Sequence, residues 1–314
     1  MQFGLHLGLR GPAGQPGPLG RLARRAEAAG YGYLGVSDHV VIARNPGTTY
    51  PYTKDGRWFA EDTGECLEQV TVVGFLAAAT ERIRLLTSVM VLGHRPPLLA
   101  AKMLATADVL SGGRLTLGVG VGWLREEFAL LPHAPEFASR GAAANETLEA
   151  FRTLWTEPAP AYAGEHVAFD GLLFSPKPAQ KPHPPIWVGG ESPAARRRAG
   201  RLGDAWYPLG NHPRWRFDTP ARYAAGLAQV RETAEAAGRP APAGSLYAIW
   251  TMPGETVRDD EGNRRPFTGE RAAIRDDLSV FAEAGLETLI TGYESPDEDT
   301  CTRRLEAFAE LAWG

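Results

Sequence analysis

The sequence predicts a single-domain α/β protein, a (β/α)8 or TIM barrel with loop insertions. Three observations predict it: strand-like and helix-like segments alternate along the chain, eight pairs can be counted, and 314 residues is a usual length for this architecture. Strands that alternate with helices are parallel, because each helix carries the chain back across the sheet. A doubly wound open sheet is the second choice.

In the first half of the chain, short apolar or β-branched runs indicate strands, and apolar residues three or four apart indicate helices. Gly30 ends the first helix, because glycine adopts the left-handed backbone of a helix stop at no steric cost. The expected order is strand 2–9, helix 19–29, strand 33–36, helix 67–80, strand 85–92, helix 96–110, strand 114–123 and helix 142–155.

The same alternation continues in the second half: strand 186–189, helix 193–202, strand 205–208, helix 220–237, strand 245–251, helix 270–284, strand 288–292 and helix 298–312. Two insertions interrupt the pattern. Residues 43–64 lack periodicity and carry aromatic, Pro and Gly residues, which is typical of a functional loop or lid. Residues 158–185 are proline-rich and predict a small β excursion around 166–169.

Composition excludes several classes of function. A net charge of −4 and a pI near 6.0 argue against a nucleic-acid or anionic-membrane surface. The N-terminus lacks the features of a signal peptide, and no stretch approaches the ~20 apolar residues of a membrane span, so a cytoplasmic location is expected. Cys66 and Cys301 have no Cys or His at metal spacing, so we expect two reduced thiols and no metal site.

In a barrel of this kind the chemistry gathers at the carboxyl ends of the strands. Asp38 and His39 follow the second strand, where an imidazole can exchange protons near neutral pH and an adjacent carboxylate can orient it. Alternatively, the pair merely caps backbone groups at the start of a loop. Thr87 and Ser88 near the end of the third strand are unusual in a buried parallel strand.

Glycines and a helix start mark two further strand ends. Gly118, Gly120 and Gly122 alternate at the fourth strand, where missing side chains let a cofactor approach the backbone, or simply permit tight packing. Their spacing is not that of a dinucleotide-binding loop. After the fifth strand, Gly189-Gly190-Glu191-Ser192 precedes Pro193, so Ser192 is a candidate N-cap and the segment a candidate anion site. A capped helix with nothing bound is the alternative.

Other residues give weaker indications. Trp58, Trp123 and Trp206 are candidates for an apolar pocket, although tryptophan in a barrel more often serves packing. His94, near the end of the third strand, is a candidate substrate contact. The sequence lacks the motifs of a serine hydrolase elbow, a phosphate-binding P-loop and a zinc-protease helix.

Taken together, Ser37-Asp38-His39, Thr87-Ser88-Val89-Met90, the glycines from Gly118 to Gly122 and Gly189-Gly190-Glu191-Ser192 resemble the bacterial luciferase-like superfamily of flavin and deazaflavin enzymes. The resemblance covers nearly the whole chain. It implies a (β/α)8 barrel that binds FMN or the deazaflavin F420, and suggests a homodimer.

The resemblance also implies roles for residues. The cofactor ring would rest on Ser88, Val89 and Met90, with a cis peptide between Ser88 and Val89. His39 would move a proton beside the ring, and Asp38 would orient His39. The ribityl and ring region would contact Gly120, Val121, Gly122 and Trp123, and the phosphate would be held by Gly189, Gly190, Glu191 and Ser192.

Three functions are compatible with these motifs. The Asp-His pair and the Thr-Ser-Val run look closest to F420-dependent enzymes, which transfer a hydride to or from a small organic substrate. The alternative is an FMN-dependent monooxygenase supplied by a separate flavin reductase. The third is a non-catalytic barrel that binds a flavin or another phosphorylated ligand. A deazaflavin carries hydride where a reduced flavin reacts with oxygen, and a phosphate site does not distinguish the two.

Overall fold

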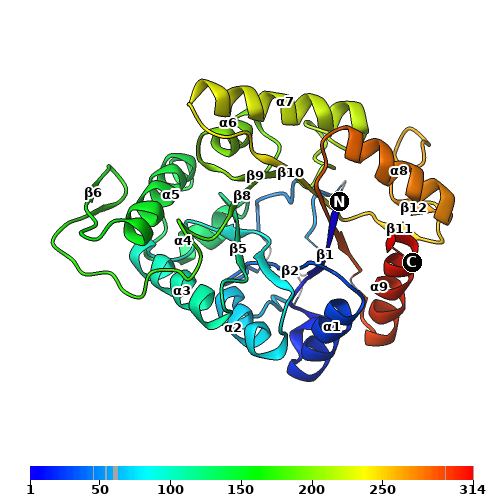
Figure 1. Ribbon diagram of the computed structural model, residues 1–314, viewed down its shortest axis with the longest axis horizontal. Helices are drawn as coiled ribbons and strands as arrows, with labels where there is room; N and C mark the ends of the chain where they lie inside the picture. Colours follow the sequence, from blue (N-terminus) through cyan, green and yellow to red (C-terminus); the bar gives the residue numbers. More distant parts are fainter. Residues whose placement is uncertain (45, 54, 59–62, 294, 314) are drawn as a thin grey trace.

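The computed structural model describes residues 1–44, 46–53, 55–58, 63–293 and 295–313. Within these residues the chain forms a closed barrel of parallel strands surrounded by helices, which confirms the predicted architecture (Figure 1). The strands follow the order β3-β2-β1-β13-β10-β9-β8-β5-β4, and the pairing of β3 with β5 closes the ring. They are β1 (Gln2–Leu7), β2 (Tyr33–Val36), β3 (Arg84–Thr87), β4 (Met90–Val91), β5 (Leu115–Gly120), β8 (Ile186–Gly189), β9 (Ala205–Tyr207), β10 (Ala243–Ala248) and β13 (Thr288–Gly292).

The third strand differs from the continuous segment that the sequence predicts. It is divided into β3 and β4 at Ser88 and Val89, and the peptide bond between these two residues is cis, as expected. Both pieces pair with β5, so the barrel stays closed across the break.

Helices cover the outside of the barrel (Figure 1). Side chains cap several of them: Glu68 accepts hydrogen bonds from the second and third amides of α2, and Ser192 and Thr219 cap α6 and α7. Gly30 has a φ of +93° after the first helix, as its predicted role requires. The helices are α1 (Pro16–Ala28), α2 (Gln69–Ala79), α3 (Pro97–Leu110), α4 (Arg125–Leu130), α5 (Arg140–Thr156), α6 (Pro193–Leu202), α7 (Pro220–Ala236), α8 (Arg271–Glu283) and α9 (Glu298–Trp313), with a 3-10 turn at Gly11–Gly14.

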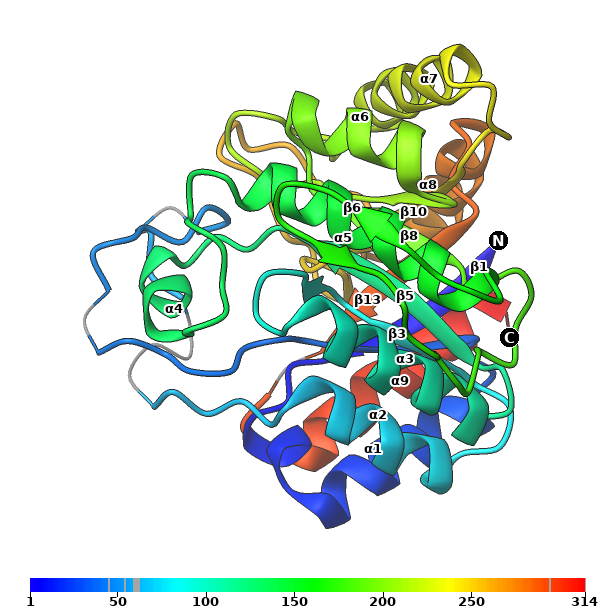
Figure 2. The same cartoon turned by 90° about the vertical axis from the view of Figure 1, so that its left-hand side faces the viewer.

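Four segments lie outside the alternating pattern. The 158–185 insertion holds the antiparallel pair β6 (Tyr162–Ala163) and β7 (Ala168–Phe169), which confirms the predicted β excursion. Two features were not predicted from the sequence: α4, and a parallel pair after β10 formed by β11 (Met252–Pro253) and β12 (Thr268–Gly269). The 43–64 insertion lies beside α4 at one end of the barrel (Figure 2), where the amides of Gly47 and Thr48 donate to Glu126. Residues 45, 54 and 59–62 of that insertion lie outside the described residues.

Two layers of apolar side chains hold the barrel together. The larger layer packs the outward faces of the strands against the helices. A smaller cluster, which includes Tyr33, Trp187, Tyr207 and Tyr247, is rich in aromatic residues. None of the helices among the described residues is both long enough and apolar enough to cross a bilayer.

We expect Gly118→Ala to destabilise the barrel. A Cβ at position 118 would lie 2.1 Å from the carbonyl oxygen of Thr87, and a backbone atom cannot move aside as a flexible side chain can. Overpacking of this kind costs roughly 1–3 kcal/mol or more. Gly74→Ala is the control, because nothing lies within 4 Å of its added Cβ and alanine favours the helix. Denaturant unfolding measures both, and equal midpoints for the two variants would contradict the prediction.

Candidate active site

A cavity of about 680 Å³ lies at the carboxyl ends of the barrel strands. Its wall also includes parts of the 43–64 insertion and of the segments that follow β5 and β9. The volume falls within the usual range of small-molecule sites, and the position is the one where barrels of this class carry their chemistry.

Most of the predicted site residues line this one cavity, although they come from distant parts of the sequence. Met90 does not: it is 1% exposed and belongs to the apolar layer between strands and helices, so its side chain packs the core. The predicted residues that line the cavity are Asp38, His39, Trp58, Ser88, Val89, His94, Gly120, Val121, Gly122, Trp123, Gly189, Gly190, Glu191 and Ser192.

His39 is oriented by a carboxylate that the sequence analysis did not single out. Its Nδ1 lies 2.8 Å from Oε2 of Glu127, and Oε1 of the same carboxylate accepts the backbone amides of Val40 and Val41. Because a carboxylate with these partners acts as the acceptor, His39 donates from Nδ1. Its Nε2 is therefore the ring nitrogen available to a ligand in the cavity.

The prediction that Asp38 orients His39 is corrected by this arrangement. Asp38 instead accepts two hydrogen bonds of 2.9 Å from Arg95 and one from the amide of Val91. Arg95 also binds Glu68, the cap of α2. Asp38 thus ties the end of β2 to the segment after β3.

His94 lies between the two carboxylates. Its Nε2 is 3.6 Å from Glu127 Oε2, and its Nδ1 is 4.0 Å from Asp38 Oδ2. Burial lowers the pKa of the imidazole, although both carboxylates act in the opposite direction. With 2% of its side chain exposed, His94 packs beside the two carboxylates and offers little surface to a substrate.

The cis peptide forms part of the cavity wall and is held from the barrel interior. The hydroxyl of Ser88 lies 2.9 Å from that of Tyr207, and its carbonyl oxygen lies 3.3 Å from Nε2 of His6. His6 stacks on Tyr247, and burial lowers the pKa of this imidazole to about 4, so it is neutral near pH 7.

The glycines around Val89 serve close packing. A Cβ on Gly120 would lie 2.7 Å from Val89 Cγ2, and one on Gly189 would lie 3.1 Å from Val89 Cγ1. The absence of side chains at Gly120 and Gly189 therefore makes room for the side chain of Val89. Gly122 has a φ of +76°, which the turn after β5 requires.

The start of α6 forms a cationic corner of the cavity. Ser192 caps the helix through the amide of Ala195, and Gly190 has a φ of +100°, which few other residues adopt. Arg140 and Arg198 line the same cavity, and their hydrogen bonds go to uncharged oxygen atoms such as the Gly122 and Gly141 carbonyls. Burial, and then the charge of Arg140, lowers the pKa of Arg198, so an anion placed here would relieve the repulsion.

Glu191 turns away from this corner. Its carboxylate accepts the hydroxyl of Tyr52 at 2.9 Å and the amides of Leu209 and Gly210. Burial raises the pKa of Glu191. The side chain therefore fastens the 43–64 insertion to the turn after β9, and the expectation that it holds an anionic group does not fit these contacts.

Aromatic rings surround His39. The ring centres of His39 and Trp58 are 4.4 Å apart, and Trp123 lies 6.1 Å from His39 and 4.9 Å from Tyr50. These rings give the cavity an apolar wall beside the imidazole. Trp206, the third candidate, packs in the fully buried core.

Three residues of the site were not predicted from the sequence: Glu127, Arg140 and Tyr207. Arg198 was predicted only as one of the consecutive arginines Arg196, Arg197 and Arg198, any one of which could reach the anion site, with most of them solvated. For Glu127 a signal was present, because acidic residues beside Leu124 and Phe128 are typical of a first helical turn. Arg140 had no such signal, because nothing in the sequence distinguishes it from an arginine on a solvated helix face.

The geometry defines a barrel enzyme with a histidine-carboxylate pair in an aromatic, partly cationic cavity. The sequence profile of the family described as luciferase-like monooxygenase matches residues 1–311, and the chain belongs to that family. Members of this family are oxidoreductases and monooxygenases.

Individual relatives differ in what they do. The uncharacterized protein Rv0940c of Mycobacterium tuberculosis is 32% identical over 302 residues, 92% of either chain. An FMNH(2)-dependent dimethylsulfone monooxygenase of Pseudomonas putida is 37% identical over 145 residues, 46% of this chain and 40% of that protein.

Solved structures share the fold at lower identity. An F420-dependent secondary alcohol dehydrogenase gives a TM-score of 0.76 at 18% identity, covering 99% of this chain and 97% of the other. The monooxygenase RslO1 of Streptomyces bottropensis gives 0.75 at 22%, covering 99% and 98%.

Proposed function

We propose that the protein is an F420-dependent oxidoreductase that transfers a hydride to or from a small organic substrate. The observation that carries the proposal is His39, held at Nδ1 by Glu127 so that Nε2 is left for the cavity. Removing a hydride from an alcohol carbon also requires removal of the hydroxyl proton, and His39 is placed to accept that proton or to return it in the reverse direction. When bound, the deazaflavin supplies or accepts the hydride.

The residues fit a cofactor of this class. The phosphate that F420 and FMN share suits the cationic corner, where the capped start of α6, the buried guanidinium of Arg198 and the half-buried one of Arg140 favour an anion. A planar ring suits the apolar wall formed by Val89 and Trp123. In this assignment Gly190 and Ser192 hold the phosphate with Arg140 and Arg198.

Arg198→Gln should weaken binding of phosphorylated ligands about tenfold or more, because a charge-assisted contact contributes roughly 1.5–3 kcal/mol. Riboflavin, and the deazaflavin without its phosphate, should bind the variant and the original protein alike. Fluorescence titration with F420, FMN and their unphosphorylated forms measures this, and Arg197→Gln on the exposed side of α6 is the control. If the original protein binds neither F420 nor FMN, both cofactor assignments fail, and a barrel for another phosphorylated ligand takes their place.

His39→Ala should reduce kcat by about 10²- to 10⁴-fold with little change in cofactor affinity, as loss of a general acid-base does. Glu127→Gln should keep cofactor affinity and lower kcat less, because an amide in place of the carboxylate weakens the hydrogen bond that orients the imidazole. Glu126→Gln, which alters the adjacent carboxylate, should keep the original kcat. Full turnover by His39→Ala would rule out the proton-transfer role.

An FMN-dependent monooxygenase supplied by a flavin reductase is the second candidate. The similarity to the FMNH(2)-dependent dimethylsulfone monooxygenase of Pseudomonas putida favours it. The fluorescence titration with F420 and FMN separates the two candidates when oxygen consumption with reduced FMN is also measured. Binding of FMN together with oxygen consumption supports the monooxygenase. A reductase partner belongs only to this second candidate, and a cytoplasmic location stays a prediction for both.

We also propose that the protein is a homodimer through α2 and α3. A helix that is apolar on both faces is ordinarily buried on both, and these adjacent helices expose Phe75, Leu99 and Leu110, the last at 70%.

Leu99→Glu should convert a dimer to a monomer in size-exclusion chromatography with light scattering. Leu173→Glu, at an exposed leucine of the 158–185 insertion, should leave the mass unchanged. A dimer that persists in Leu99→Glu would place the interface elsewhere.

A further inference from the structure

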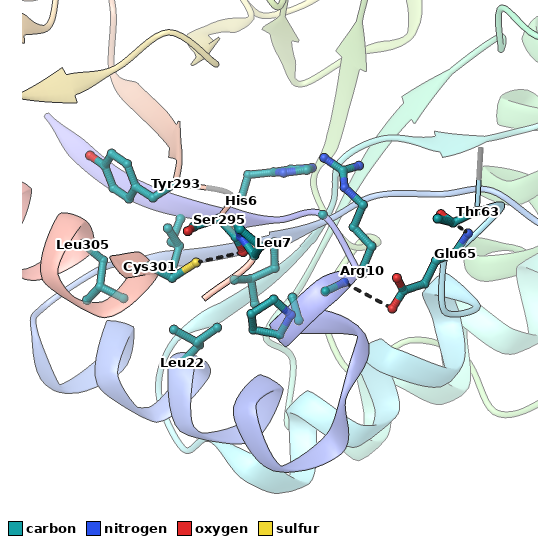
Figure 3. Close-up of a pocket in the computed structure, with 16 residues that line it drawn as sticks. His6, Leu7, Arg10, Leu22, Thr63, Glu65, Tyr293, Ser295, Cys301 and Leu305 are labelled. Carbon is teal, nitrogen blue, oxygen red and sulfur yellow. Dashed lines mark hydrogen bonds between the residues drawn. The ribbon is translucent and has the colours of Figure 1, made fainter. Parts of the chain in front are cut away.

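A second cavity, of about 350 Å³, adjoins the candidate active site. Figure 3 shows it beside the end of β1, with residues of α1 and α9 below and Tyr293 after β13 at one side. It therefore lies largely in the layer between strands and helices, whereas the active-site cavity opens over the strand ends.

Two residues line both cavities: His6 at the end of β1 and Arg10 just after it. Their side chains lie next to each other in Figure 3, and the charge of Arg10 contributes to lowering the pKa of His6. Leu9, between them, is fully buried with a φ of +55°. A left-handed backbone at a leucine is unfavourable, and such residues cluster at ligand sites. This turn forms the partition between the two cavities.

The lining of the second cavity is mainly apolar. Leu7, Leu22 and Leu305 form its floor, and Cys301 adds a thiol that contacts the Ser295 carbonyl. Arg10 and Glu65 lie on the opposite side of the cavity from Cys301 and Leu305 (Figure 3), and Arg10 also lines the active-site cavity. The part of the cavity lined by these leucines suits a hydrocarbon group.

We infer that this second cavity binds a compact apolar group of the substrate, one that is branched or cyclic, while the reacting carbon stays beside His39. The substrate would be an organic compound with one small polar reacting centre and one hydrocarbon part, which passes His6 and Arg10 to enter the layer between β1 and α9. The inference rests on the proposed function in calling this compound a substrate. The side cavity then sets the size of the group that is accepted.

The test uses secondary alcohols of increasing apolar size: 2-propanol, cyclopentanol, cyclohexanol and cyclooctanol. In the original protein each methylene added to the ring should tighten binding up to about fourfold, because burial of a CH₂ contributes ~0.8 kcal/mol. Cys301→Phe places a phenyl ring in the cavity and should reduce this gain while leaving 2-propanol binding unchanged. Cys301→Ser keeps nearly the size of the thiol, can donate to the same Ser295 carbonyl and should retain the gain. Ligand-observed NMR titration gives the dissociation constants.

Ala13→Leu narrows the cavity from the 3-10 turn and serves as a second variant if Cys301→Phe does not fold. An equal gain with ring size in the original protein and in a folded narrowed variant would overturn the inference, because the rings would then lie in the active-site cavity. A crystal structure with cyclooctanol gives an independent answer: the ring carbons farthest from the hydroxyl lie past His6 and Arg10 in the second cavity, or the inference is wrong.

Failure of this inference and failure of the proposed function are distinguishable. Titration of the same variants with F420 and FMN reports on the cofactor site and should give the affinities of the original protein. If the original protein binds neither cofactor, the oxidoreductase proposal fails, yet the dependence on ring size still tests the side cavity.

Discussion

The carboxylate of Glu127 is the contact on which the arrangement of the active site depends. It is fully buried, and it accepts one imidazole and two backbone amides at the end of β2. A buried carboxylate is costly unless its oxygens are hydrogen-bonded, so α4 and the segment after β2 are constrained to meet in one geometry. The same contact selects the His39 nitrogen that faces a ligand. The position and tautomer of His39, and the geometry of the loop after β2, thus depend on the carboxylate of Glu127.

A second constraint acts at the third strand. The break at Ser88 and Val89 directs Val89 toward Gly120 and Gly189, which have no side chains to obstruct it. Three neighbouring strands therefore share one tightly packed point at the cavity floor. Because Ser88 is also bonded to Tyr207, the break is held from the barrel interior as well as from the neighbouring strands. The floor is tightly packed, whereas the walls come from loops and insertions.

Because the floor comes from the strands and the walls come from loops, one barrel fold can carry different reactions. The structures of an F420-dependent alcohol dehydrogenase and of a monooxygenase superpose on the chain with TM-scores of 0.76 and 0.75, at 18% and 22% identity. Fold similarity at this level does not select a reaction, since function depends on the groups placed at the strand ends. In this chain those groups are a carboxylate-oriented histidine, a cationic corner and an aromatic wall. The side cavity behind β1 adds a place where substrates can be distinguished by size.

The sequence by itself determined the barrel, the strand ends that carry the site, the cap at Ser192 and the cis bond at Ser88, the last through family resemblance. These features depend on local patterns: strand and helix periodicity, glycine stops and short motifs. The tertiary structure alone decided that Glu127 and not Asp38 orients His39, that Glu191 binds Tyr52, that Met90 packs the core, and that a second cavity adjoins the first. His39 and Glu127 are 88 residues apart, and Asp38 and Arg95 are 57 apart. Such pairings arise only when the barrel closes, because hydrogen bonding among buried charges is settled by which elements meet and not by the residues adjacent in sequence.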